Sequence, residues 1–170
     1  MTQQAQVAAR TFLDVYEREH AITMKVLRAY PAGRADLRPH PQCRTAKELA
    51  WVFVLERGLG TMLLQDAFAQ GPPAGEAPPV PDRWEDVLDQ LEAAHREFGE
   101  RVASLTEEEL DGRVSFFTGP QKMGTYTRRE ILWFLLHDQI HHRGQFSIYL
   151  RMADGRVPSI YGPSGDEPWT

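Results

Sequence analysis

Four long stretches of this chain repeat apolar residues at intervals of three and four, and this periodicity constrains the fold more than any other feature. Such intervals place apolar side chains on one face of an α-helix, so each stretch predicts an amphipathic helix with one buried face. The stretches cover roughly residues 9–30, 45–67, 82–102 and 127–153. No stretch of comparable length alternates apolar and polar residues as a half-buried strand does. The sequence therefore predicts an all-α protein, a bundle of four helices.

Residues at the ends of these stretches predict where the helices begin. In a capping box, a threonine and a glutamate three residues later bond reciprocally to exposed amides at a helix start. Thr45 and Thr127 begin such boxes ahead of two long helices, and Thr106 begins one that caps a short extra turn. Asp82, with Glu85 three residues later, is predicted to open the third long helix in the same way.

The segments outside the four predicted helices differ from them in composition, which indicates how each connection or tail is built. A run rich in glycine and proline over residues 71–81 predicts a stiff, non-helical link between the second and third long helices. Residues 114–118 are short and β-prone, and we expect irregular structure before the fourth. The segment 159–163 is rich in turn formers but holds Ile160 and Tyr161, so we predict that packing orders it.

Length and composition exclude several classes of protein. With 170 residues, 42% hydrophobic and 25% charged, the chain fits one domain over residues 1–170. Its net charge of −5 argues against a nucleic-acid partner, because general attraction to phosphates needs a basic surface. The single cysteine excludes an internal disulfide and a cysteine-based zinc site. No apolar run is long enough to cross a membrane and the start lacks a signal peptide, so we expect a cytoplasmic protein with no membrane partner.

Polar residues on the apolar stripes are the candidates for a functional site, because sites in helical bundles are built from side chains that point inward. The fourth stretch places three histidines and a carboxylate in an otherwise apolar helix. Asp138 and His142 are four residues apart and share one face, while His137 and His141 share another about 100° away. We predict that Asp138 and His142 point inward, and that Glu56 on the second helix faces them.

These three side chains, Glu56, Asp138 and His142, form a ligand set for one divalent cation. A carboxylate and an imidazole one helical turn apart can bind the same ion, and the facing helix adds a further oxygen. Mixed nitrogen and oxygen ligation suits Zn, Ni, Fe or Mn. His20 and His141 are candidates for an extra ligand. The remaining positions on the ion would accept water or a substrate thiol or carbonyl, which predicts hydrolysis or transfer of a small molecule.

Two alternatives stay open at this point. The three side chains can instead form a metal-free hydrogen-bonded cluster that fixes the helix register, and the bundle is then a small-molecule-binding or dimeric stress-response module. The spacing Glu-x-x-His at residues 17–20 and 92–95, and its aspartate version at 138–141, is also used by bundles that hold two irons. The glutamates of the first two motifs lie at the polar edges of their stripes, which argues against such a centre.

The last third of the chain resembles a known family. The run from His141 to Gln145, followed by residues 149–151 and 157–164, is similar to that of the DinB/YfiT-like superfamily, and the resemblance covers essentially the whole chain. It implies an up-down-down-up four-helix bundle, often a homodimer, in which one histidine on the second helix and a His-x-x-x-His pair on the fourth hold a divalent metal. Members include thiol-dependent S-transferases, maleylpyruvate isomerases and proteins regarded as metal-dependent hydrolases. Membership alone does not select the reaction.

The ligand positions implied by this resemblance are altered in the present sequence. The second histidine of the pair corresponds to His142, its partner four residues earlier is Asp138, and the histidine of the second helix corresponds to Val52. An aspartate can still coordinate a cation, but a valine cannot. The nearest substitutes are Glu56, one turn further on, and His20. The resemblance therefore implies either a site rebuilt with carboxylates or one that has been lost.

Several other side chains receive a structural interpretation. Arg143 is predicted to anchor a neighbouring carboxylate or the segment around Tyr161. Gly144 is predicted to be a close-packing point for a facing helix, and Phe134 to lie in the core. His95, on the apolar face of the third helix, is interpreted as a core histidine bonded to a hydroxyl or carbonyl.

Overall fold

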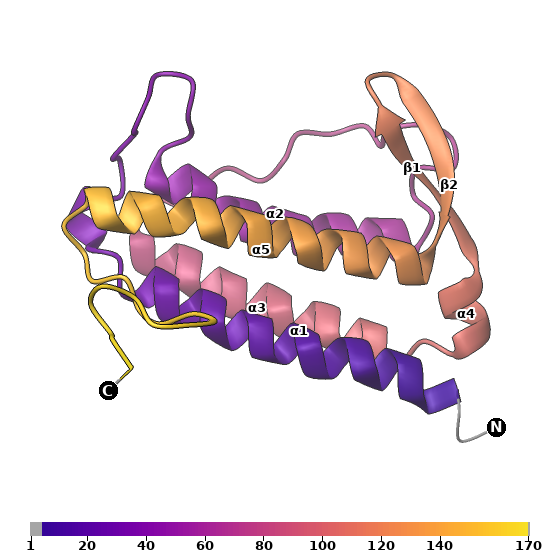
Figure 1. Ribbon diagram of the computed structural model, residues 1–170. Helices are drawn as coiled ribbons and strands as arrows, with labels where there is room; N and C mark the ends of the chain where they lie inside the picture. Colours follow the sequence, from indigo (N-terminus) through magenta and orange to yellow (C-terminus); the bar gives the residue numbers. More distant parts are fainter. Residues whose placement is uncertain (1–4, 170) are drawn as a thin grey trace.

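The computed structural model describes residues 5–169, and four long helices dominate it. They pack as two layers, α2 beside α5 above α1 beside α3 (Figure 1). A two-stranded hairpin and a short helix lie at one end of the bundle (Figure 1). The four-helix bundle predicted from the sequence is therefore confirmed. The elements are α1 (Ala5–Arg28), a 3-10 turn (Ala32–Arg34), α2 (Ala46–Leu64), α3 (Trp84–Ala103), α4 (Glu107–Asp111), β1 (Arg113–Gly119), β2 (Lys122–Thr127) and α5 (Arg128–Met152).

The long helices follow an up-down-down-up order. Helices α2 and α3 run in the same direction, opposite to α1 and α5 (Figure 1). Because two parallel neighbours cannot be joined by a tight turn, residues 65–83 travel back along the length of the bundle as an extended link. No helix within residues 5–169 is long and apolar enough to span a membrane. The predicted absence of a signal peptide concerns residues 1–4, which lie outside the described residues.

The capping boxes predicted at Thr45, Thr106 and Thr127 are all present. Each threonine side chain accepts a bond from the backbone N–H of the glutamate three residues on, whose side chain bonds back to the threonine N–H. The box predicted at Asp82 is wrong. Helix α3 starts one residue later, with Arg83 as its N-cap and no side-chain cap bond. The backbone carbonyl of Asp82 instead accepts a hydrogen bond from Lys47 Nζ at 3.1 Å, which links the residue to α2.

The irregular structure expected at residues 114–118 is replaced by regular antiparallel pairing. Strand β1 pairs with β2 in a register that places Phe116 opposite Gly124. Gln121 at the turn has a φ of 57°. The backbone N–H of Ser115 donates to Asp66 Oδ1 at 2.7 Å, which ties the hairpin to the end of α2. A β-prone segment forms a strand only when a second strand pairs with it. The sequence pattern had not identified residues 122–127 as that partner.

The most buried face of helix α5 differs from the predicted one, because Asp138 and His142, which were predicted to point inward, are only half-buried. Gln139 and Arg143 are buried at 6% and 2% exposure, whereas Phe134 is 51% exposed and Met152 46%. The prediction that Phe134 is a core residue is therefore wrong. Gly144 has no neighbouring atom within 4 Å of where a Cβ would lie, so its predicted close packing is wrong too. Apolar residues lie almost all round this helix, so its periodicity does not single out one buried face.

The C-terminal segment is ordered by packing, as predicted. Its residues fold back over the ends of α1 and α5 (Figure 1). The Tyr161 hydroxyl donates to Glu19 Oε2 at 2.5 Å and accepts from Arg143 NH2 at 2.5 Å. Arg143 NH2 also bonds Glu19 Oε2 directly, at 2.8 Å. The prediction that Arg143 anchors a carboxylate and the segment around Tyr161 is confirmed.

Candidate metal site

The structure brings together the three side chains predicted as metal ligands. Glu56 lies on α2, while Asp138 and His142 lie one turn apart on α5, which packs against α2. His142 Nε2 is 3.5 Å from Glu56 Oε1 and 4.0 Å from Asp138 Oδ2. One ligand atom from each of the three lies within 4.8 Å of the other two. Ligand atoms this close together can bind a single cation.

The surroundings of the Glu56 carboxylate are the strongest indication that this cluster binds a cation. The residue is only 5% exposed, and within residues 5–169 neither of its carboxylate oxygens has a hydrogen-bond donor. Burial, together with the nearby charge of Asp138, raises the pKa of Glu56 to about 9. Two carboxylates this close need either a shared proton or a cation between them. The donor set therefore fits a divalent ion, which would take the place of the proton.

His142 is suited to ligation by its charge state. Burial lowers the pKa of its imidazole, and the opposing attraction of Asp138 is the smaller effect. The ring is therefore neutral near neutral pH, and a neutral imidazole has one nitrogen with a lone pair that can bind a cation. The other nitrogen, Nδ1, is buried and finds no hydrogen-bond partner among the described residues. Nothing in that part of the chain ties Nδ1 to a second group, as a ligating histidine usually is.

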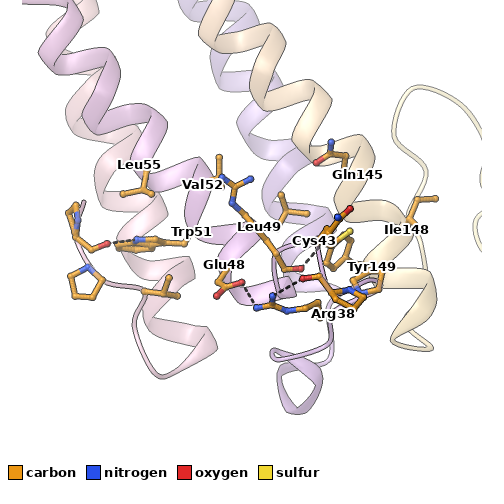
Figure 2. A pocket seen from close by; sticks show the side chains of 17 residues that line it. Arg38, Cys43, Glu48, Leu49, Trp51, Val52, Leu55, Gln145, Ile148 and Tyr149 are labelled. Carbon is orange, nitrogen blue, oxygen red and sulfur yellow. Dashed lines mark hydrogen bonds and ion pairs between the residues drawn. The ribbon is translucent and has the colours of Figure 1, made fainter. Parts of the chain in front are cut away.

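A pocket of about 840 Å³ opens beside the three side chains. Its walls come from α2, from α3 at Gln90 to Glu97, and from the linker at residues 73–78. The linker is held against α2 by a hydrogen bond from Trp51 Nε1 to the Pro78 carbonyl, 2.9 Å long (Figure 2). A small molecule in this pocket would reach a cation held by Glu56, Asp138 and His142.

Neither histidine suggested as an extra ligand belongs to this cluster. His141 is exposed, and its Nε2 lies 2.8 Å from Gln145 Nε2 on the next turn. His20 stacks on His95, with ring centroids 3.5 Å apart and planes inclined by 6°. Its Nδ1 lies 3.4 Å from Arg57 NH2. His20 is therefore part of a separate group between α1, α2 and α3.

The two-iron arrangement is not assembled. Glu17 bonds His95 on α3, with its Oε2 at 3.0 Å from Nε2, and does not pair with His20 of its own motif. Glu92 instead forms an ion pair with Arg28. Across residues 5–169, Glu56, Asp138 and His142 are the only group of three potential ligands close enough to hold a metal. His95 is a buried histidine as interpreted, although its ring bonds a carboxylate in place of a hydroxyl or carbonyl.

Arg57 is the buried charge that sequence reasoning missed. It is 2% exposed, and its guanidinium donates to the Phe53 carbonyl at 2.6 Å and lies over the Tyr16 ring, 5.7 Å from the centroid. No carboxylate of residues 5–169 lies within ion-pair distance of it. The spacing could have indicated its burial, because Phe53, Arg57 and Gly60 lie at i, i+4 and i+7 on one face of α2.

The chain matches the DinB family over residues 1–169, and it belongs to that family. Among curated relatives it is 30% identical over 157 residues to the uncharacterized protein YrdA of Bacillus subtilis strain 168, which covers 92% of this chain and 89% of the relative.

Two solved structures share the fold. A DinB-like protein from Bacillus cereus superposes with a TM-score of 0.70 at 24% identity, covering 88% of this chain and 95% of that one. The DinB-like protein YjoA from Bacillus subtilis gives a TM-score of 0.65 at 16% identity, covering 85% and 92%. At these identities the similarity establishes the fold alone.

Proposed function

We propose that this DinB-family protein is a metal-dependent hydrolase of small molecules. The observation that carries the proposal is the buried carboxylate of Glu56, which has no hydrogen-bond donor within the described chain and faces Asp138 and His142 at the edge of a pocket. Glu56, Asp138 and His142 would hold one divalent cation. When bound, such a cation acidifies water and polarises a carbonyl oxygen.

The donor set favours hydrolysis over thiol transfer. Two carboxylates and one imidazole make an oxygen-rich, hard set that suits Mn, Fe or Zn, with Ni as a further candidate. Hard ligands favour an oxygen nucleophile, whereas thiolates are better matched by softer sites. Hydrolysis would add the hydroxyl of water to an electrophilic carbon and its proton to the leaving group. The chain's own residues would fix the charge at the centre and, through the pocket walls, orient the substrate.

One observation favours a second candidate, a metal-free binding module. Because burial raises the pKa of Glu56 to about 9, a protonated Glu56 can share its hydrogen with Asp138 near neutral pH. The pocket would then bind a small molecule without catalysis. The homodimer implied by the family resemblance is also a proposal, supported by apolar side chains exposed along one face of α5, Phe134, Ile148 and Met152.

Metal analysis separates these candidates. We expect protein purified without chelators, or incubated with Mn, Fe, Zn or Ni salts, to retain about one divalent ion per chain by elemental mass spectrometry. Glu56→Gln and His142→Ala should lose it, and His141→Ala, which alters the exposed neighbour, should keep it. Circular dichroism establishes that each variant is folded. A folded wild-type protein that retains no ion, or a His142→Ala variant with full occupancy, would contradict the metal site.

A further inference from the structure

A second pocket adjoins the first along the outer surface of α2. It has a volume of about 1040 Å³ and lies between the loop at residues 38–44, the first turns of α2, the linker and the end of α5 (Figure 2). The two pockets are lined in common by Arg44, Trp51, Val52, Leu55 and Pro78. The two pockets therefore meet along α2, and together we call them the α2 groove, which reaches from the loop around Cys43 to Glu56, Asp138 and His142.

The middle of this groove is apolar. Trp51, Val52 and Leu55 make its wall on α2, and the Trp51 indole is fixed by its bond to the Pro78 carbonyl (Figure 2). Val52 stands where the family resemblance places a metal-ligating histidine. With valine there, the passage between the two pockets has no polar group at that position, and it is suited to an apolar chain or ring.

Arg44 is the exposed positive charge that lines both pockets, whereas Arg57, which lines only the pocket at the proposed metal site, is buried. The Arg44 guanidinium makes no hydrogen bond or ion pair with any residue between 5 and 169, although the residue lines both pockets. Arg38, the other exposed arginine of the groove, already has partners, because it donates to Glu48 Oε2 at 3.2 Å and to the Pro41 carbonyl at 3.4 Å (Figure 2). Glu48 is in turn held by the capping box of α2. An incoming anion would therefore find its counter-charge at Arg44.

The acidic residues of the groove indicate which end of a bound ligand would carry a negative charge. Glu76 and Glu97 line the pocket that holds the proposed metal ligands, and neither lines the pocket around Cys43. Their negative charges oppose an anionic group there, whereas Arg44 attracts one at the junction of the two pockets. Arginine also presents its donors in a planar fork that matches the geometry of a carboxylate.

We propose that the groove binds an amphipathic carboxylic acid, with its carboxylate on Arg44 and its apolar body against Trp51, Val52 and Leu55. This assignment rests on the proposed function in one respect: the far end of the molecule, which would carry the hydrolysable bond, then lies at Glu56, Asp138 and His142. Arg44 is a specificity-determining residue that binds the substrate away from the reacting bond.

The test uses 4-phenylbutyrate and its neutral counterpart 4-phenylbutyramide as probes. Both are titrated calorimetrically into EDTA-treated protein, so that a carboxylate cannot be captured by a bound metal. We expect the acid to bind at least about tenfold more tightly than the amide, since a charge-assisted contact is involved. Arg44→Gln should abolish that difference and leave the amide unchanged. Arg113→Gln, which removes an exposed arginine from the hairpin, should behave as the wild type.

Position is checked by the Trp51 indole N–H signal in NMR spectra, assigned with Trp51→Phe, which should shift when the acid binds. Equal affinity for acid and amide, an unaltered affinity in Arg44→Gln, or no binding of either probe would each overturn the proposal. Because no metal takes part, these outcomes are separate from the metal analysis. If the protein retains its ion but does not bind the acid, the hydrolase proposal stands and the carboxylic-acid proposal is wrong.

Discussion

Single buried polar residues in this protein are stabilised in two different ways. Arg143 is surrounded by conventional partners, the Glu19 carboxylate at 2.8 Å and the Tyr161 hydroxyl at 2.5 Å. Among the described residues, Arg57 contacts a backbone carbonyl, a histidine nitrogen and an aromatic ring, and no carboxylate lies within ion-pair distance of it. A buried cation without a carboxylate is costly, so its neighbours must remain uncharged. His20, which lies beside Arg57, and His95, which stacks on His20, must therefore stay neutral.

The stability contributed by His20 and His95 should therefore fall as the pH is lowered below about 6.5. Burial lowers the pKa of both His20 and His95 to about 3, and the charge of Arg57 acts in the same direction. Glu17 opposes this at His95, but its side chain is 62% exposed, so water screens its charge. Between pH 6.5 and 3 the unfolded chain binds protons that the folded chain does not. Each histidine then lowers the free energy of unfolding by at most about 1.4 kcal/mol per pH unit.

Urea unfolding of EDTA-treated protein at several pH values measures this slope. The double variant His20→Gln/His95→Gln should flatten it, because two of the groups that take up protons on unfolding are gone. His137→Gln, which changes an exposed histidine of α5, should leave the slope unaltered. A double variant with the slope of the wild type would show that other groups control the acid response.

At the scale of the helix, α2 shows how position decides the effect of a residue type. Gly58 and Gly60 lie two residues apart on the same helix but on different faces. A Cβ at Gly58 would meet no atom within 4 Å. A Cβ at Gly60 would lie 2.6 Å from Cε2 of the Phe98 ring and 3.1 Å from a Leu135 methyl group. The close approach of α2 to α3 and α5 therefore depends on Gly60.

Alanine at these two positions should have opposite effects. Gly60→Ala should destabilise the protein by about 1–3 kcal/mol, because the buried Phe98 ring cannot move without disturbing the core. Gly58→Ala should stabilise it by about 0.5–1 kcal/mol, since alanine restricts the unfolded chain at no steric cost. Denaturant midpoints at a common m-value provide the comparison. Two variants of equal stability would contradict the contact at Gly60.

Across the whole molecule, the C-terminal segment links the second half of α1 to the end of α5. Tyr161 contacts Glu19, 142 positions earlier, and Lys25 on α1 pairs with Glu167 at 2.7 Å. Asp166 accepts bonds from Arg151 and from the Val157 backbone at 2.6 and 2.8 Å. The described residues of the segment pack on α1 and α5 and line neither pocket of the α2 groove.

Removing the Tyr161 hydroxyl tests this linkage. Tyr161→Phe should lower the free energy of unfolding by about 1–3 kcal/mol, because a buried ion pair loses a hydrogen-bond partner on each side. Tyr126→Phe provides a matched control, since no hydrogen bond of the Tyr126 hydroxyl is formed with the described residues. It should change stability by less than about 0.5 kcal/mol. Equal effects of the two substitutions would show that the segment is held by its other contacts alone.

The sequence by itself determined the helices, three of their caps and the identity of the clustered polar side chains. These features follow from local geometry: a repeat of 3.6 residues per turn places Asp138 beside His142 whatever surrounds them. Capping boxes likewise bond within four residues of chain. The anchor role of Arg143 was also readable, because a cation on an apolar stripe requires a partner.

Only the tertiary structure decided which face of α5 is buried, where β1 finds its partner strand, and which groups compensate Arg57. These outcomes depend on contacts between residues far apart in the chain, and several sequence patterns are compatible with more than one set of contacts. Helix α5 is apolar almost all round, so its packing against α1 and α2 selected Gln139 and Arg143 over Phe134 as buried residues. The groove along α2 arises in the same way, because the returning linker supplies a wall that no local rule predicts.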